Sequence, residues 1–172
     1  MTLHTKIRCI PDYPKPGILF RDITTLIKDP KSFHGVIDDL RARYAAETIQ
    51  AIVGIESRGF IIGAALAYAL NVGFVPIRKK GKLPAATIKQ SYQLEYGMDE
   101  IEIHEDAIIP GQRVVLVDDL LATGGTAKAA AQLIKTLQGT IVECCFVVDL
   151  PECGGRKCLE SQGLKVFSLC EY

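Results

Sequence analysis

The distribution of apolar and polar residues along the chain predicts alternating strands and helices. Short apolar runs rich in β-branched residues are typical of buried strands, and they occur at 49–57, 72–82, 113–119, 140–150 and 164–172. Segments with apolar residues at helical spacing lie at 32–47, 58–71 and 125–138. This alternation predicts a single α/β domain over residues 1–172, with a central parallel sheet flanked by helices.

Four segments depart from that alternation. The proline-rich stretch 11–24 cannot form a regular helix, and Ser32 is predicted to cap the helix that follows it. Residues 79–99 are polar and predict a long mobile flap with at most a marginal hairpin. The alternating sequence EIEIHED at 100–106 predicts an edge strand, and 151–163 predicts a weak helix or loop.

Composition narrows the classes of function. The 172 residues carry 20 basic and 20 acidic side chains, so the net charge of zero argues against broad binding to nucleic acid. No apolar run has the length of a membrane span, and the first residues lack the apolar core of a signal peptide, so we expect a cytoplasmic protein. Six cysteines without zinc-type spacing are expected to be free thiols, with Cys144 and Cys145 in the core.

Three polar segments follow predicted strands: Glu56–Gly59, Arg78–Lys82 and Asp118–Thr126. Ligands of open α/β sheets bind at the carboxyl ends of the strands, so we expect these segments to meet in one site. The last contains a predicted phosphate cup, because its glycines permit positive φ and its amides open a helix. The cup lacks the endings of a Walker A loop or a dinucleotide fingerprint. Its members are Ala122, Thr123, Gly124, Gly125 and Thr126.

Two adjacent acids stand beside this predicted cup. Asp118 and Asp119 would repel a bare phosphate, but an ionised carboxylate accepts hydrogen bonds from sugar hydroxyls. The same pair can hold a magnesium ion through water, or stabilise positive charge that develops on a sugar ring. The pattern therefore indicates a sugar phosphate as the ligand.

The stretch VVLVDDLLATGGTA resembles the phosphoribosyl-pyrophosphate signature of the type I phosphoribosyltransferases. PGILFRDIT, ESRGF, IRKKGKLP and YQLEYG match the adenine-using branch of that family in order and approximate spacing, so the resemblance covers nearly the whole chain. It implies transfer of phosphoribosyl from phosphoribosyl pyrophosphate to adenine, with magnesium as cofactor. It also implies a homodimer, a small N-terminal hood at about 1–30 that binds the base, and a flexible flap at about 79–99.

The resemblance implies roles for individual residues. The cup binds the ribose phosphate, Asp118 and Asp119 face the ribose, and Glu95 is the acid–base group, with Tyr96 helping to close the flap. Ser57 and Arg58 belong to a pyrophosphate loop that in this family often carries a non-proline cis peptide bond. The remaining implied residues are Arg78, Lys79 and Lys82 for pyrophosphate, and Leu19, Phe20 and Arg21 for adenine.

Alternatives remain open on the sequence. It is also compatible with a phosphoribosyltransferase for another purine, a regulatory protein that binds phosphoribosyl pyrophosphate and operator nucleic acid, or a metabolite-binding module. Individual residues have simpler interpretations too. Arg58 and the charge run 78–82 could face solvent, Leu19 and Phe20 could plug the core, and Glu95 could be an exposed loop acid.

Overall fold

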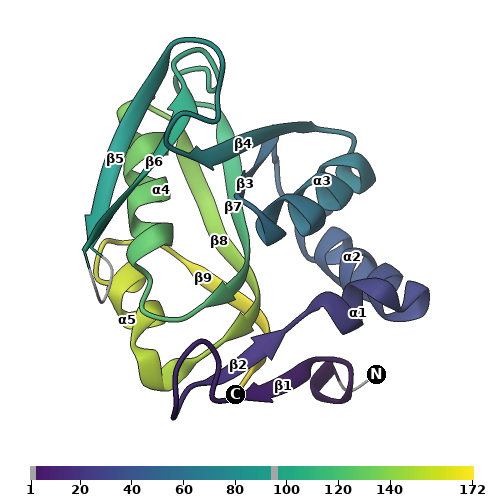
Figure 1. The fold of residues 1–172 in the computed structure, drawn as a ribbon. Coiled ribbons are helices and arrows are strands. Elements are labelled where there is room, and N and C mark those ends of the chain that lie inside the picture. The colour runs from purple at the N-terminus through teal and green to yellow at the C-terminus, as the bar shows by residue number, and fades with distance from the viewer. Residues whose placement is uncertain (1–2, 94–96) are drawn as a thin grey trace.

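A seven-stranded sheet forms the centre of the molecule in a computed structural model that describes residues 3–93 and 97–172 (Figure 1). The strand order is β5-β6-β4-β3-β7-β8-β9, and the five strands from β4 to β9 in that order run parallel. These parallel strands are β3 (Ala51–Ile55), β4 (Gly73–Lys79), β7 (Arg113–Leu121), β8 (Thr140–Asp149) and β9 (Val166–Glu171).

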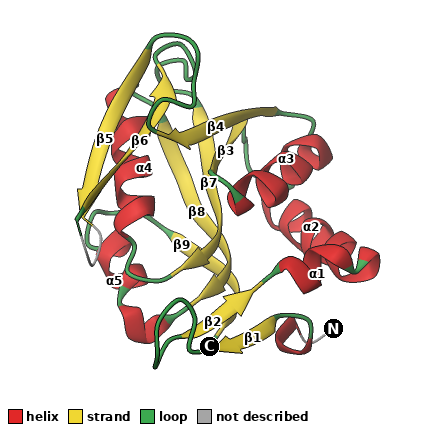
Figure 2. Cartoon of the chain, viewed as in Figure 1, coloured by secondary structure: helices red, strands yellow, loops and turns green. Residues whose placement is uncertain are grey.

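Helices cover both faces of this sheet. On one face lie α2 (Pro30–Tyr44) and α3 (Arg58–Leu70); on the other lie α4 (Gly125–Thr136) and α5 (Gly155–Glu160) (Figures 1 and 2). Ile62 of α3 packs in one core with Val115 of β7, whereas Ile134 of α4 packs in the other core with Leu116. Successive β7 side chains thus enter opposite cores, which explains the unbroken apolar run. The predicted α/β fold is confirmed.

The N-terminal residues form a separate small sheet. A short 3-10 helix, η1 (Leu3–Thr5), precedes strands β1 (Arg8–Pro11) and β2 (Leu19–Asp22), which pair antiparallel. Helix α1 (Thr24–Lys28) then leads into α2. As expected, the proline-rich segment holds no helix before Thr24 (Figure 2). Its prolines lie at the end of β1 and in the turn that follows. The weak helix expected at 151–163 is a 3-10 turn, η2 (Pro151–Cys153), followed by α5.

The interpretation of residues 79–99 as a flap with a marginal hairpin underestimates the observed structure. Strands β5 (Thr87–Gln93) and β6 (Met98–His104) pair antiparallel over seven register positions and extend the main sheet beyond β4. The strand predicted at 100–106 is present as β6, but its predicted position at the edge is wrong, because β5 lies outside β6. The polar sequence of β5 suits a sheet edge that is partly solvated on both faces, so no apolar pattern marked it as a strand.

The start of α2 differs from prediction as well. Asp29, rather than Ser32, caps the helix, and its carboxylate accepts hydrogen bonds from the backbone N–H groups of Lys31 at 3.0 Å and Ser32 at 3.2 Å. Pro30 follows at the first helical position, where its missing N–H has no cost. Lys6 donates to Asp29 at 2.6 Å, and this bond together with the amide donors lowers the pKa of Asp29 to about 2.

Two further expectations concern burial and membranes. Cys144 and Cys145 are buried in the core as predicted, and burial raises the pKa of each thiol to about 12. Among the helices of residues 3–93 and 97–172, none has the length and apolar character needed to cross a bilayer.

Candidate active site at the ends of the parallel strands

The carboxyl ends of β3 and β7 bring two of the three predicted segments together. These strands are parallel neighbours, with Gly54 in register with Val117, so the loops after them emerge at the same edge. After β3, the peptide bond between Glu56 and Ser57 is cis, as the family resemblance implied, and α3 begins at Arg58. β7 itself continues through Asp118 and Asp119 to Leu121.

A hollow of about 360 Å³ opens between these loops, and we call it the strand-end hollow. It combines three carboxylates, those of Glu56, Asp118 and Asp119, with the cationic Arg58 and Lys79, which suits a ligand that carries both hydroxyls and phosphates. The structure therefore brings together residues from all three predicted segments, 56–59, 78–82 and 118–126. The lining is Ile55, Glu56, Ser57, Arg58, Lys79, Tyr92, Asp118, Asp119 and Thr126.

The predicted phosphate cup lines a second, smaller hollow of about 120 Å³ beside the first. Asp118 and Thr126 border both hollows, so a phosphate in the cup would be continuous with a ligand in the strand-end hollow. Gly124 caps α4 with φ of +83°, and a Cβ there would lie 3.0 Å from the Gly155 carbonyl oxygen. The expectation of positive φ is wrong for Gly125, because that residue is the first of the right-handed helix.

The two acids have different environments. Asp119 is 4% exposed and pairs with the Arg58 Nε. Asp118 forms no ion pair within the described residues, and its carboxylate accepts a hydrogen bond from the Asp119 backbone N–H at 2.9 Å. Burial and the neighbouring Asp119 charge raise the pKa of Asp118 well above its usual range. Of the two acids, the ionised form of Asp118 is therefore stabilised more by a hydroxyl donor or a cation that a ligand brings.

Gly59, in the first turn of α3, permits the close approach of that helix to β7. A methyl group on Gly59 would lie 2.8 Å from the Val117 carbonyl oxygen and 2.9 Å from an Asp118 carboxylate oxygen. Both distances are far below a normal carbon–oxygen contact. Sequence reasoning treated this glycine only as part of a segment and missed its role.

Gly59→Ala is expected to destabilise the fold by about 1–3 kcal/mol and to weaken binding of any ligand held by Asp118, because the added methyl displaces that strand end. Urea unfolding measures the first effect and ligand titration the second. Gly73→Ala is the control, since a methyl group at that position would meet nothing within 4 Å, and it should change stability by less than about 0.5 kcal/mol. Equal stability of the two variants would contradict the prediction.

Glu56, which sequence reasoning also missed as a site residue, orders the basic segment, residues 78–82. Its carboxylate accepts hydrogen bonds from Arg78 at 3.1 and 3.3 Å and from the Lys79 backbone N–H at 3.1 Å. Arg78 also donates to the Lys82 carbonyl at 3.0 Å. Of the three predicted basic residues, Lys79 alone lines the strand-end hollow; Arg78 and Lys82 do not. Lys79 therefore lies at the hollow, whereas Arg78 and Lys82 shape the turn.

The predicted base segment, Leu19–Arg21, lies on β2 of the small N-terminal sheet. Leu19 is 47% exposed, so the alternative that it plugs the core is wrong. The Phe20 ring centroid lies 5.7 Å from the Arg58 guanidinium carbon, which connects this segment to the strand-end hollow. Arg21 turns elsewhere: it donates to the Cys9 Sγ, and its guanidinium lies over the Tyr172 ring at 4.0 Å.

Glu95 and Tyr96 lie outside the described residues. Tyr92, two residues before the gap, lines the strand-end hollow and donates to Asp99 at 3.1 Å. Strand β5 thus brings residue 92 to the site. Sequence reasoning missed Tyr92 because no pattern distinguishes it from other residues of the flap.

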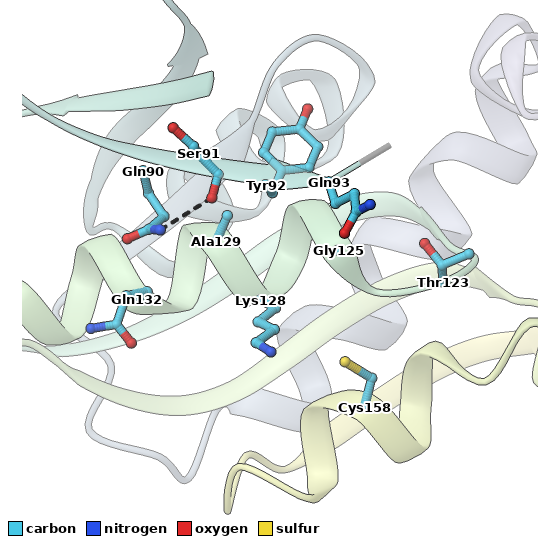
Figure 3. Close-up of a pocket in the computed structure, with 10 residues that line it drawn as sticks. All are labelled: Gln90, Ser91, Tyr92, Gln93, Thr123, Gly125, Lys128, Ala129, Gln132 and Cys158. Atoms are coloured by element: carbon cyan, nitrogen blue, oxygen red, sulfur yellow. Dashed lines mark hydrogen bonds between the residues drawn. The ribbon is translucent and has the colours of Figure 1, made fainter. Parts of the chain in front are cut away.

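A larger hollow, about 620 Å³, lies elsewhere, between β5 and helices α4 and α5 (Figure 3). Thr123 and Gly125 border it, but neither Asp118 nor Asp119 does, and among the described residues Lys128 alone adds a charged side chain to its lining. Figure 3 shows Lys128 and Cys158 on the side of α4 away from Ser91 and Tyr92. Charge and hydrogen-bonding groups are concentrated at the strand-end hollow, so we assign the candidate active site there despite its smaller volume.

Residues 25–166 match the family model of the phosphoribosyl transferase domain. The sequence is 62% identical to the adenine phosphoribosyltransferase of Nitrosospira multiformis over 172 residues, which are 100% of this chain and 98% of that relative. It is 56% identical to the enzyme of the same name from Rhizobium meliloti over 170 residues, with 99% and 94% of the two chains covered.

Solved structures agree with these sequence relatives. The crystal structure of adenine phosphoribosyltransferase from Thermoanaerobacter pseudethanolicus superposes with a TM-score of 0.94 at 48% identity, covering 99% of this chain and 98% of the other. The Saccharomyces cerevisiae enzyme, complexed with an imino-altritol bisphosphate and adenine, gives a TM-score of 0.91 at 42% identity, covering 98% and 96%. The similarity therefore extends over nearly the full length of this chain and of each of these relatives.

Proposed function

The chain belongs to the phosphoribosyltransferase family and transfers the phosphoribosyl group of phosphoribosyl pyrophosphate to adenine, and we propose how its residues divide this reaction. The products are AMP and pyrophosphate, a purine salvage reaction. The observation that carries the proposal is the continuity of the phosphate cup with a hollow that is lined by three acids and two cations.

The sugar phosphate occupies both hollows in this proposal. The 5-phosphate binds the amides and hydroxyls of Ala122, Thr123, Gly124, Gly125 and Thr126 at the start of α4, where the helix dipole favours an anion. Asp118 and Asp119 accept hydrogen bonds from the ribose hydroxyls. The pyrophosphate binds Ser57, Arg58 and Lys79, with Arg78 and Lys82 adding positive charge from the basic segment.

The arrangement of Arg58 and Asp119 bears on substrate binding. Arg58 is paired with Asp119 in the structure, so both groups are held at the hollow before a substrate arrives. A pyrophosphate competes for the guanidinium, and the ribose hydroxyls replace its hydrogen bonds to Asp119. Each charged group therefore exchanges one partner for another, which limits the cost of leaving a charge unpaired.

Adenine is read by the base segment, Leu19, Phe20 and Arg21. The backbone carbonyl and N–H groups beside Phe20 accept from the exocyclic amine and donate to a ring nitrogen, which distinguishes amino from oxo purines. The 5.7 Å separation between the Phe20 ring and the Arg58 guanidinium supports this placement, because it puts the base segment beside the pyrophosphate loop. Glu95 accepts the imidazole proton that adenine loses as its other ring nitrogen attacks the anomeric carbon.

Charge changes along the reaction explain the acids at the site. As pyrophosphate departs, the ribose becomes cationic, and the carboxylates of Asp118 and Asp119 stabilise that charge. Arg58 and Lys79 stabilise the negative charge that accumulates on the leaving group. Residues 79–99, with Tyr96, close over the site and exclude water, which would otherwise hydrolyse the activated sugar. Residues 1–30 form the hood that carries the base segment.

Magnesium fits this set of residues. Carboxylate oxygens are the hard ligands that magnesium prefers, and Asp118 has no ion-pair partner among the described residues. Within residues 3–93 and 97–172, no cluster of three or more His, Cys, Asp or Glu side chains is suited to hold a metal. Asp118 or Asp119 would hold magnesium through water, together with the substrate. When bound, magnesium supplies positive charge to the pyrophosphate.

We further propose a homodimer and a reducing, cytoplasmic location. Tyr68, which is 90% exposed, and Ile61 place large apolar side chains on the outer side of α3, and such surfaces favour association. All six cysteines are free thiols in the structure, which suits a reducing compartment. Analytical ultracentrifugation tests the first proposal: Tyr68→Glu should yield monomers if α3 lies at the interface, and an unchanged dimer would exclude that face.

A direct assay tests the substrate assignment. Purified protein with magnesium and phosphoribosyl pyrophosphate should release pyrophosphate and form AMP with adenine, and much less product with hypoxanthine or guanine. Preference for an oxopurine would indicate the related transferase class. Binding of phosphoribosyl pyrophosphate without turnover of any base would favour a regulatory protein or a metabolite-binding module. Titration with duplex DNA would then distinguish these two, because only the regulatory protein should bind it.

A further inference from the structure

Glu102 on β6 is a buried carboxylate that the proposed reaction does not use. The residue is 2% exposed, and it forms no ion pair within the described part of the chain. One carboxylate oxygen accepts hydrogen bonds from the backbone N–H groups of Lys82 and Leu83, each at 3.0 Å. A buried charge is retained at such cost only when nearby groups compensate it. Here the compensating groups are the backbone amides of the basic segment.

The basic segment forms a closed turn around this carboxylate. Gly81 has φ of +76°, and the Lys82 N–H donates to the Lys79 carbonyl at 3.2 Å. Glu102 is the register partner of Arg78 across the β4–β6 pair, so it lies directly beneath the start of the turn. Its pKa is lowered, since the backbone donors of residues 81–83 outweigh the opposing effect of burial.

This arrangement offsets part of the positive charge of the segment. Four cationic residues lie within five positions, 78–82, and their mutual repulsion opposes an ordered turn. Three of them have carboxylate partners: Arg78 pairs with Glu56, Lys79 with Asp99 at 3.4 Å and Lys80 with Glu100 at 3.3 Å. Glu102 instead binds the backbone. It supplies negative charge beneath the turn, and among the described residues the Lys82 ammonium has no carboxylate partner at its tip.

We propose that Glu102 is a positioning residue for the pyrophosphate subsite: by holding the backbone of the basic segment, it keeps Lys79 and Lys82 preorganised for the ligand. The proposal rests on the assignment of that segment to pyrophosphate. The two carboxylates hold different parts of the segment: Glu56 binds the Arg78 side chain and the Lys79 backbone N–H, whereas Glu102 binds the backbone N–H groups after Gly81. Preorganisation matters because a misplacement of about 1 Å can cost up to 10²-fold in rate.

The test compares Glu102→Gln, which keeps the size and one acceptor oxygen, with two further variants. Isothermal titration with magnesium pyrophosphate should show binding about tenfold weaker for Glu102→Gln, and the KM for phosphoribosyl pyrophosphate should rise by a similar factor. AMP carries no pyrophosphate group, so its binding and the KM for adenine should stay within about twofold. Glu105→Gln, at an exposed position three residues along the chain, is the matched control and should match wild type in every measurement.

Lys82→Ala separates this inference from the assignment on which it rests. If Lys82→Ala weakens pyrophosphate binding and Glu102→Gln does not, the positioning role is overturned. If neither variant weakens it, the basic segment is not the pyrophosphate subsite. Equal weakening of pyrophosphate and AMP by Glu102→Gln would indicate general destabilisation and would also overturn the proposal.

Hydrogen exchange supplies a readout that does not depend on activity. The amides of Lys82 and Leu83 should exchange faster in Glu102→Gln than in wild type, with the amides of β3 unchanged, because the weaker acceptor releases only the turn. Unchanged protection of those two amides would contradict the proposal. Glu102→Asp, which keeps the charge on a shorter side chain, replaces the glutamine variant should the latter not fold.

Discussion

Asp118→Asn is expected to lower kcat by about 10²- to 10³-fold, the loss typical when a preorganised group that stabilises transition-state charge is removed. Asp118 borders both the phosphate cup and the strand-end hollow, so it lies where the proposed ribose position joins the two. It is also the acid without an ion pair in the described residues, so its charge is available to a cationic sugar. The KM values should change less than kcat, since the charge on the ribose develops only during transfer.

The pH dependence provides a second measurement for this variant. Because burial and Asp119 raise the pKa of Asp118 in the free protein, protonation of Asp118 should lower kcat/KM for phosphoribosyl pyrophosphate as the pH falls through that pKa. The stability contribution has the opposite sign. A carboxyl with a raised folded-state pKa stabilises the fold below its unfolded-state pKa, and that contribution is lost as the pH rises through the folded-state value. Asparagine does not titrate, so Asp118→Asn should lack both effects.

Asp106→Asn, at an exposed position after β6, is the control for loss of one negative charge and should retain wild-type kcat. Asp119→Asn provides a comparison at the neighbouring acid. It also breaks the ion pair with Arg58, so it should raise the KM for phosphoribosyl pyrophosphate as well as lower kcat. A kcat for Asp118→Asn within a fewfold of wild type would remove Asp118 from the proposed stabilisation of the ribose.

Glu95→Gln is expected to lower kcat by about 10²- to 10⁴-fold while weakening substrate binding far less, as for loss of a general acid–base group. Glutamine preserves the size and polarity of the side chain but cannot accept the adenine proton. Steady-state kinetics with each substrate varied in turn measures both effects. In the reverse direction, pyrophosphorolysis of AMP should fall by a comparable factor, since the same group then protonates the leaving base.

Tyr96→Phe distinguishes proton transfer from closure of the flap. It leaves Glu95 intact, so a small effect of Tyr96→Phe beside a large effect of Glu95→Gln assigns the loss to the carboxylate. Near-wild-type turnover by Glu95→Gln would refute the acid–base assignment, and adenine would then need another proton acceptor.

Much of the site follows from local sequence. The apolar run before Asp118 predicts the strand, and the glycines after it predict a turn into a helix, because both patterns depend on neighbouring residues alone. The resemblance of several stretches in order predicted the family, and the comparisons confirm it. The sequence underestimated strand β5, because Ile88 and Tyr92 are the residues of this strand that pack against the core, and two such side chains among polar neighbours do not mark a strand.

The tertiary structure decided how the charges are partnered. Arg58 pairs with Asp119 across 61 positions of sequence, and Arg78 pairs with Glu56 across 22. Charge patterns do not specify such pairs, because the distance between them depends on which strands are neighbours and in what register. The same reason explains Glu102, which reads as one polar residue of an alternating strand, yet the β4–β6 register places its carboxylate beneath the amides of the basic segment. Local sequence thus determined the elements and the kind of ligand, whereas the sheet order and register determined which groups meet it.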